Sequence, residues 1–161
     1  MKKLITALLT VMLLIASIAY AADSLKDAEI EYTKGNFLKA IKLYKPLALK
    51  GNVDAQWKLG LMHDVGQGFP QDYTEAAKWY KLAAERGHIN SQAILGVMYS
   101  MGQGVPQDII KCHMWLNLAA AQGDAHASDI RRTEEKSMTP QQIAQAQKLA
   151  SECLAKNYKG C

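Results

Sequence analysis

The strongest constraint on the fold is a 36-residue segment that occurs twice in succession, as residues 52–87 and 88–123. The two copies align without a gap and share many residues. The identical pairs include Gln56/Gln92, Leu59/Leu95, Gly60/Gly96, Gly66/Gly102, Gly68/Gly104, Asp72/Asp108, Trp79/Trp115 and Gly87/Gly123. A repeat of this length is typical of stacked arrays, in which each unit buries its apolar face against its neighbours. The repeat therefore predicts an extended surface rather than a reaction centre.

The second half of each copy is predicted to be one helix. Between Asp72 and Arg86, apolar residues recur at steps of three and four, which is the helical period. Asp72 can cap the start of this helix, and the glycine that follows Arg86 can end it in a left-handed conformation. The duplicate helix runs from Asp108 to Gln122. The residues expected to have structural roles in these helices are Asp72, Asp108, Trp79 and Trp115.

The first half of each copy, residues 54–65 and 90–101, is also predicted to be helical. Gly60 and Gly96 lie inside these helices, where glycine costs about 1 kcal/mol relative to alanine. Because the cost recurs at the same place, we expect the backbone there to lie close to the second helix of the pair. The connection between the two helices is predicted to be a fixed turn that depends on Gly66, Gly68, Gly102 and Gly104.

The period continues in weaker form on both sides of the two copies. Residues 22–51 are predicted to be a degenerate first repeat with a shorter turn at Gly35. Residues 124–161 are predicted to contain capping helices, the last of which begins at a capping box formed by Thr139 and Gln142. The chain is therefore predicted to be an all-α array of about four helix pairs, whose end units tolerate water.

Residues 1–21 have the pattern of a signal peptide. Lys2 and Lys3 form a positively charged start, an apolar run follows, and Ala-Tyr-Ala ends at Ala21. Cleavage there would start the mature chain near Ala22, and the protein would be periplasmic or secreted. The alternative is an uncleaved membrane anchor, because the apolar run is just long enough to span a bilayer.

The charge balance argues against a nucleic-acid partner. The chain has 19 basic and 15 acidic residues, and without Lys2 and Lys3 its net charge falls from +4 to about +2. No basic run longer than Arg131-Arg132 follows the predicted leader. We therefore expect no nucleic-acid partner, and a membrane partner only if the leader is not cleaved.

The sequence predicts no catalytic residue, metal site or cofactor. It contains no Ser-x-x-Lys, Gly-x-Ser-x-Gly or His-Glu-x-x-His pattern. The Gly-Gln-Gly segments lack the Lys-Ser/Thr pair or third glycine of phosphate-binding loops. Cys112 and His113 point about 100° apart on a helix and have no further ligand at a suitable spacing. His63 and His113 align with Tyr99 and Ala77, which indicates ordinary packing or surface residues.

Three segments of the first copy carry a family resemblance. They are Ala-Gln-Trp-Lys-Leu-Gly from Ala55, Gly-Gln-Gly-Phe-Pro-Gln-Asp from Gly66, and Ala-Ala-Lys-Trp-Tyr-Lys-Leu-Ala-Ala-Glu-Arg-Gly from Ala76. With these segments the chain resembles the Sel1-like repeat family, which is related to the tetratricopeptide repeat. Residues 90–123 resemble the repeat equally, and residues 31–51 look like the shortened first unit of exported bacterial members. The resemblance implies a right-handed α-solenoid and an adaptor that binds a protein or a peptide.

Two other functions remain open under this resemblance. Some cysteine-rich secreted members have been described as penicillin-binding or β-lactamase-like, although the sequence lacks the nucleophile and base patterns of such enzymes. With an uncleaved leader, the chain would instead be an envelope-anchored structural scaffold.

The resemblance also indicates where a partner would bind. In tetratricopeptide arrays the first helix of each pair lines the concave face. The candidate binding residues on these helices are Trp57, Leu61, Asp64, Ala93, Val97 and Ser100. Trp57 aligns with Ala93, so the packing does not require a large ring there, and an exposed tryptophan is a common interface anchor. The alternative is that Trp57 fills a gap against the shorter first unit.

The three cysteines have different predicted fates. The spacing of Cys153 and Cys161 resembles that of disulfides in the cysteine-rich members, and Gly160 can turn the chain back between them. We predict that they form a disulfide that pins the C-terminus. The alternative is that Cys161 links two chains. Cys112 aligns with Ala76 on the apolar face and is predicted to stay reduced and buried.

Overall fold

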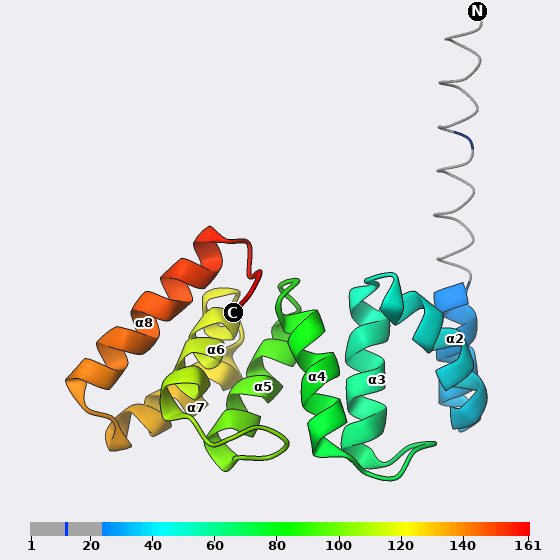
Figure 1. Ribbon diagram of the computed structural model, residues 1–161, viewed down its shortest axis with the longest axis horizontal. Helices are drawn as coiled ribbons and strands as arrows, with labels where there is room; N and C mark the ends of the chain where they lie inside the picture. The colour runs from blue at the N-terminus through cyan, green and yellow to red at the C-terminus, as the bar shows by residue number, and fades with distance from the viewer. Residues whose placement is uncertain (1–11, 13–23) are drawn as a thin grey trace, which may run out of the picture.

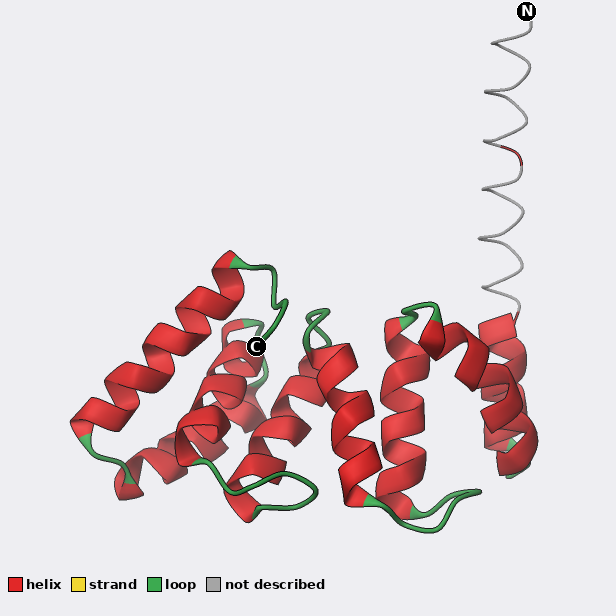
Figure 2. Ribbon diagram, viewed as in Figure 1, coloured by secondary structure: helices red, strands yellow, loops and turns green. Residues whose placement is uncertain are grey.

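The computed structural model of the protein describes Met12 and residues 24–161. The predicted signal peptide, apart from Met12, lies outside the described residues. All elements of the described part are helical, and it contains no strand (Figure 2). None of its helices is long and apolar enough to cross a bilayer.

The helices follow one another with short connections. Residues 24–33 are helical, and the later elements are α2 (Phe37–Leu49), α3 (Val53–Val65), α4 (Tyr73–Ala84), α5 (Ile89–Met101), α6 (Ile109–Ala121), α7 (Ala125–Glu134), the 3-10 helix η1 (Glu135–Ser137) and α8 (Pro140–Ala155). The prediction of an all-α chain is therefore confirmed. The helices expected from the two repeat copies occur as α3 to α6.

These helices form an α-solenoid, as predicted (Figure 1). Helix α2 packs on α3, α3 on α4, α4 on α5 and α5 on α6, so neighbours in sequence are neighbours in space. The last two helices depart from this pattern, because α7 and α8 both pack on α6. As a result, the C-terminal end of the array is covered by two helices that share one support.

A buried glutamine joins each repeat copy to the unit before it. The side-chain amide of Gln56 donates to the carbonyl oxygen of Ala48 at 3.0 Å, and that of Gln92 donates to Ala84 at 3.1 Å. Both glutamines are almost fully buried. Each bond is a second one to a carbonyl at the end of the preceding second helix, because Ala48 and Ala84 also accept the backbone N–H groups of Gly51 and Gly87 at 3.0 and 2.9 Å. The identity of Gln56 and Gln92 thus has a structural cause.

A second duplicated pair of bonds fixes the turn inside each copy. The side chain of Gln71 donates to the carbonyl of Asp64 at 2.7 Å, and Gln107 makes the same bond to Ser100 at 2.7 Å. The turns start at Gly66 and Gly102, which have φ values of 80° and 68° and end α3 and α5 in the left-handed conformation. They finish at the predicted caps, where Asp72 accepts from Glu75 N at 3.0 Å and Asp108 from Lys111 N at 3.0 Å.

The helical glycines lie where the two helices of a pair approach closely. A methyl group added at Gly60 would lie 2.7 Å from Cδ1 of Tyr80, and one added at Gly96 would lie 2.8 Å from Cγ of Leu116. Tyr80 and Leu116 occupy the same position of α4 and α6, and both are fully buried. The absence of a side chain at these two positions therefore lets each first helix contact its partner.

The C-terminal disulfide occurs as predicted. Cys153, at the end of α8, is bonded to Cys161, with 5.6 Å between the two Cα atoms. The chain between them turns through Asn157 and Tyr158, which both have positive φ. The ring of Tyr158 then lies next to Gly87, in the turn that follows α4. The bridge therefore holds the last residues against the second repeat unit.

Cys112 is free and fully buried, as predicted. Burial raises the pKa of its thiol to about 12. A thiol with so high a pKa contains very little of the reactive thiolate at neutral pH.

His113 has a more specific role than its alignment with Ala77 indicated. Its side chain is fully buried, and its Nε2 lies 2.7 Å from Oε1 of Glu135. The same carboxylate oxygen is 2.5 Å from the guanidinium of Arg131. His113 therefore ties α6 to the connection between α7 and α8, which is the place where the helix pairing changes.

Candidate binding site

A hollow of about 490 Å³ lies between the first two units of the array. It is bounded by the helix of residues 24–33, by α2 and by α3. Its lining residues are Leu25, Lys26, Glu29, Tyr44, Asp54, Trp57 and Lys58. The hollow therefore combines apolar, aromatic, basic and acidic groups.

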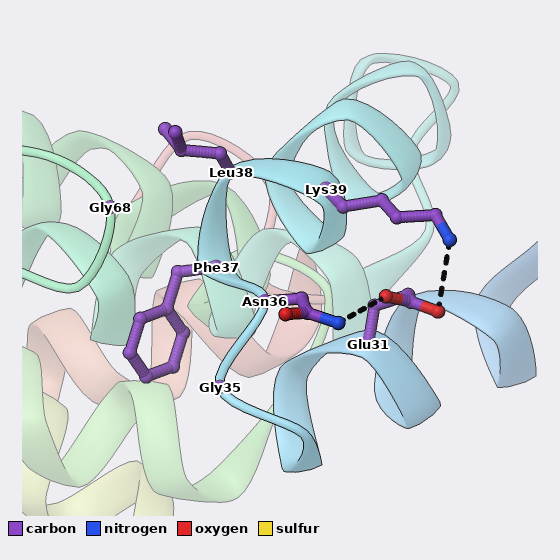
Figure 3. Close-up of a pocket in the computed structure, with 7 residues that line it drawn as sticks. All are labelled: Glu31, Gly35, Asn36, Phe37, Leu38, Lys39 and Gly68. Atoms are coloured by element: carbon purple, nitrogen blue, oxygen red, sulfur yellow. Dashed lines mark hydrogen bonds and ion pairs between the residues drawn. The ribbon is translucent and has the colours of Figure 1, made fainter.

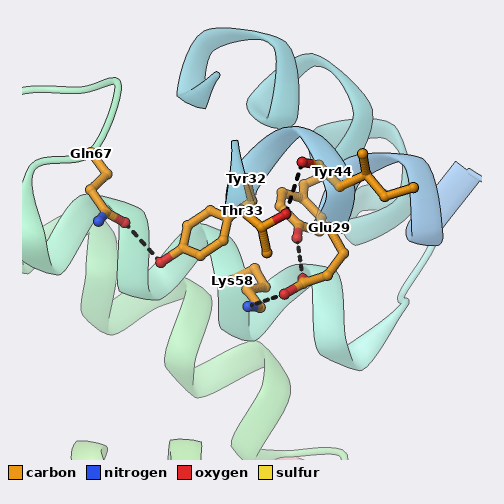
Figure 4. A network of polar contacts seen from close by, with 7 residues as sticks. Glu29, Tyr32, Thr33, Tyr44, Lys58 and Gln67 are labelled. Atoms are coloured by element: carbon orange, nitrogen blue, oxygen red, sulfur yellow. Dashed lines mark hydrogen bonds and ion pairs between the residues drawn. The ribbon is translucent and has the colours of Figure 1, made fainter. Parts of the chain in front are cut away.

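Glu29 holds the polar side of this hollow together (Figure 4). One of its oxygens accepts a bond of 2.6 Å from the hydroxyl of Tyr44, and the other accepts one of 2.9 Å from Nζ of Lys58. Burial by itself would raise the pKa of Glu29, but these two bonds and the charge of Lys58 hold it below its usual value. Glu29 is therefore ionised at neutral pH and keeps Lys58 in place.

Lys58 lies between two aromatic rings. Its Nζ is 4.4 Å from the ring centre of Tyr32 and 5.0 Å from that of Trp57. Both distances are short enough for attraction between a cation and the face of a ring. The ammonium group is thus fixed by a carboxylate and by two rings.

Trp57 is half-buried rather than fully exposed. Its ring packs against the core cluster that joins α4, α5, α6 and α8, and it lies 5.3 Å from the ring of His88. The indole nitrogen is covered and has no hydrogen-bond partner among the described residues. Trp57 therefore packs toward the third unit while it also borders the hollow beside the first unit.

The other five predicted binding residues lie outside this hollow. The side chain of Asp64 accepts a bond of 3.1 Å from the hydroxyl of Tyr80, and Ser100 donates one of 2.7 Å to Glu134. Ala93 packs against the core cluster around Cys112 and Leu116. The remaining two, Leu61 and Val97, are half-buried. Of the six, only Trp57 borders the hollow.

The sequence analysis did not identify Glu29, Tyr44 and Lys58 as site residues. One signal was present, because Tyr44 aligns with Tyr80 one repeat later. The hydroxyl groups of both tyrosines donate to a carboxylate on the first helix of their pair, Glu29 and Asp64 respectively. In the next unit leucine and serine replace the tyrosine and the acid. Because the tyrosine and the acid are lost together, their hydrogen bond could have been inferred from the sequence.

A second hollow, of about 560 Å³, lies at the turn between residues 24–33 and α2 (Figure 3). Its polar groups are already paired, because the carboxylate of Glu31 accepts from Asn36 at 2.9 Å and lies 3.1 Å from Nζ of Lys39. The hydrogen bond from Asn36 and then the contact with Lys39 lower the pKa of Glu31. We regard this hollow as less suited to a partner than the one beside Trp57.

The described part of the chain contains no group of three His, Cys, Asp or Glu side chains that is suited to a metal ion. The hollow around Trp57 is lined by the Lys58–Glu29 pair, by Lys26 and Asp54, and by the side chains of Tyr44 and Trp57. Such a surface can hold an apolar side chain and a neighbouring polar group of a ligand.

The His88 ring next to Trp57 predicts a dependence of stability on pH. Its Nδ1 accepts the N–H of Ser91 at 3.2 Å and so caps α5, and burial lowers the pKa of His88 below 6.5 in spite of the charge of Asp54. As the pH falls, His88 takes up a proton in the unfolded chain before it does so in the folded protein. Its contribution to the free energy of unfolding is therefore complete above pH 6.5 and is lost as the pH falls toward the folded pKa. We expect the melting temperature to fall on acidification from about pH 7.5 to about pH 5.

The variant His88→Asn separates this effect from other titrations. Asn52 occupies the same position of the preceding copy and caps α3 through its own side chain. The variant should keep the cap, and its melting temperature should depend less on pH than that of the wild type. An unchanged pH dependence would mean that His88 is not the group responsible.

Comparison with known proteins agrees with the repeat architecture. The chain matches the Sel1 repeat over residues 30–52, 53–88 and 89–124, which is more than half of its length. These limits lie within one residue of the two copies found in the sequence. No curated protein sequence matches the chain.

Two solved structures are similar. One is c5321, a protective antigen present in uropathogenic Escherichia coli strains that displays an SLR fold; its TM-score is 0.79 and its identity 28%, over 86% of this chain and 30% of that chain. The other is a Sel1 repeat protein from Oxalobacter formigenes, with a TM-score of 0.57 and 34% identity over 58% of this chain and 27% of that chain. The present chain thus spans less than a third of the length of either. The matched repeats and the shared fold establish that the chain belongs to the Sel1 repeat family.

Proposed function

We propose that this protein is an exported adaptor that binds a protein or a peptide along the concave face of its solenoid, with the hollow around Trp57 as its anchor. Sel1 repeats generally mediate protein–protein interactions, and proteins of this family are generally non-catalytic scaffolds. The observation that carries the proposal is the hollow itself, in which a half-buried tryptophan borders an ordered Lys58–Glu29 pair.

The lining of the hollow favours a particular kind of ligand. Leu25 and the ring of Trp57 offer apolar contact, while Lys26 and Asp54 are exposed at its border. An apolar or aromatic side chain of the partner would lie against the ring, and a flanking charged or polar group would meet Lys26 or Asp54. Tryptophan at such a position typically contributes strongly to binding.

Export is supported by the leader pattern of residues 1–21 and by the disulfide, since disulfides persist in oxidising compartments. We expect mass spectrometry of the protein recovered from the periplasm or the medium to find an N-terminus near Ala22. A mature protein that still begins with Lys2 and Lys3 would favour the envelope-anchored scaffold instead.

The replacement Trp57→Ala tests the binding site. A peptide ligand is first selected from a displayed random library on the immobilised wild-type protein. We expect the variant to bind this peptide about 30-fold more weakly, which corresponds to about 2 kcal/mol. Binding is measured by fluorescence anisotropy of the labelled peptide.

Trp79→Ala is the matched control. Trp79 is also half-buried, but it packs against the first-unit core from α4 and does not border the hollow. Both variants should lose stability because both remove a large packed ring. Only Trp57→Ala should lose affinity. If the two variants bind the peptide equally, the binding surface lies elsewhere on the array.

A further inference from the structure

The solvent-facing side of α2 carries an unusual row of residues. Leu38, Lys42, Lys45 and Leu49 follow one another at steps of four, three and four, so they form one stripe along the helix. All four are exposed, and the two leucines keep 69% and 71% of their surface accessible. Helix α2 contains no aspartate or glutamate. We call these four residues the α2 stripe.

The same positions of α4 carry neither exposed leucines nor lysines without an acidic partner. Lys78 and Lys81 align with the two lysines of the α2 stripe, but they are paired with Glu75 at 2.9 Å and with Glu85 at 3.5 Å. Threonine and glutamate replace the two leucines. Among the described residues, neither Lys42 nor Lys45 has a carboxylate within 4.0 Å.

In α6 the corresponding positions hold no lysine and are less exposed, since Ile110 and Asn117 are half-buried and only Ala121 is exposed. Met114 aligns with Lys42 and is almost fully buried, and α8 packs on α6. Of the three second helices related by the repeat, α2 alone presents exposed leucines together with lysines that have no acidic partner in the described structure. The packing of the solenoid does not explain this combination, because the opposite side of α2 already makes the core contacts through Ala40, Tyr44 and Ala48.

We propose that the α2 stripe binds the surface of an anionic phospholipid membrane. The ammonium groups of Lys42 and Lys45 complement the headgroup phosphates, and the two leucines flank them in the same direction, where they can enter the boundary between headgroups and acyl chains. An acidic protein would also complement the lysines, but it gives no reason for leucines exposed at both ends of the row. The stripe lies on a second helix, so this inference does not rest on the peptide site beside Trp57. It departs from the expectation that a membrane partner requires an uncleaved leader, because the exposure of the two leucines is evident only in the folded structure.

The test is the binding to vesicles of the protein purified from the periplasm or the medium, after mass spectrometry has identified its N-terminus. We compare vesicles of phosphatidylcholine alone with vesicles that contain about one-third phosphatidylglycerol, in a sedimentation assay at low and at high salt. We expect binding to the anionic vesicles only, and loss of most of this binding at high salt, because salt screens the lysine charges.

Two double variants decide whether the stripe is responsible. Lys42→Gln/Lys45→Gln should bind the anionic vesicles about 30-fold more weakly, which is about 2 kcal/mol for two lysines at such a surface. Lys78→Gln/Lys81→Gln removes the same charge from the aligned positions of α4 and should bind like the wild type. Residues 1–23 are the same in both variants, so any contribution of that segment is also the same.

Three results would overturn the proposal. Equal losses in both double variants would mean that net charge alone governs binding. Equal binding to vesicles with and without phosphatidylglycerol would remove the role of the anionic headgroup. Absence of vesicle binding, together with lysine-dependent binding of polyglutamate, would assign the stripe to an acidic protein instead.

Discussion

Gly104→Ala is expected to lower the free energy of unfolding by about 2–4 kcal/mol. Gly104 has a φ of +69°, which alanine adopts only with strain, and a methyl group there would lie 2.0 Å from the carbonyl oxygen of Tyr73 and 2.8 Å from the nitrogen of Thr74. These are backbone atoms in the first turn of α4, so they cannot move aside as a side-chain end could. The loss should appear in urea-induced unfolding.

Gly123→Ala is the control for the strain alone. Gly123 also has a positive φ, of +97°, but no atom lies within 4 Å of an added methyl group. Its loss should be about 1 kcal/mol, from the backbone conformation only. The difference between the two variants measures how closely the turn of the third unit approaches α4. Equal losses in both would show that this contact is not tight.

The second large effect is expected at the C-terminal disulfide. Cys161→Ser should lower the free energy of unfolding by about 2–3 kcal/mol, because the bridge closes a loop between residues eight apart and restricts the unfolded chain. Tyr158 would also lose its fixed position beside Gly87. Differential scanning calorimetry with and without a thiol reductant measures the effect.

The reductant provides an internal control for this prediction. It should lower the melting temperature of the wild type but leave that of the double variant Cys153→Ser/Cys161→Ser unchanged, because the remaining cysteine, Cys112, is buried and forms no disulfide. A wild type whose melting temperature does not respond to reduction would contradict a stabilising role for the bridge.

The parts of the fold that the sequence predicted are those whose residues recur at the same positions of both repeat copies. Asp72 and Asp108 cap their helices, and Gly66 and Gly102 end theirs, because each local turn is determined by a few adjacent residues. Their duplication in aligned copies is enough to identify them as structural. The disulfide was predicted for a different reason, because the spacing of Cys153 and Cys161 resembles that of disulfides in cysteine-rich members of the family.

The parts that the sequence did not predict depend on contacts between distant residues that occur once. Glu29 contacts Lys58 across 29 positions, and His113 contacts Glu135 across 22. Neither contact has a duplicate in the aligned copies. The packing of both α7 and α8 on α6 was missed for the same reason, because no second capping segment exists with which to compare it.

The glutamine bond between units also indicates how an array of this kind can grow. Gln56 and Gln92 each donate from their own copy to a carbonyl of the unit before it. One copy therefore contains both the glutamine that donates to the preceding unit and the carbonyl that accepts from the following one. Tandem duplication of one unit therefore creates a new junction that is already complete. The position that would continue the series is Ser128, which is too short to repeat the bond. Insertion of further units is thus favoured before residue 124, and the C-terminal cap marks the boundary at which the array stops being modular.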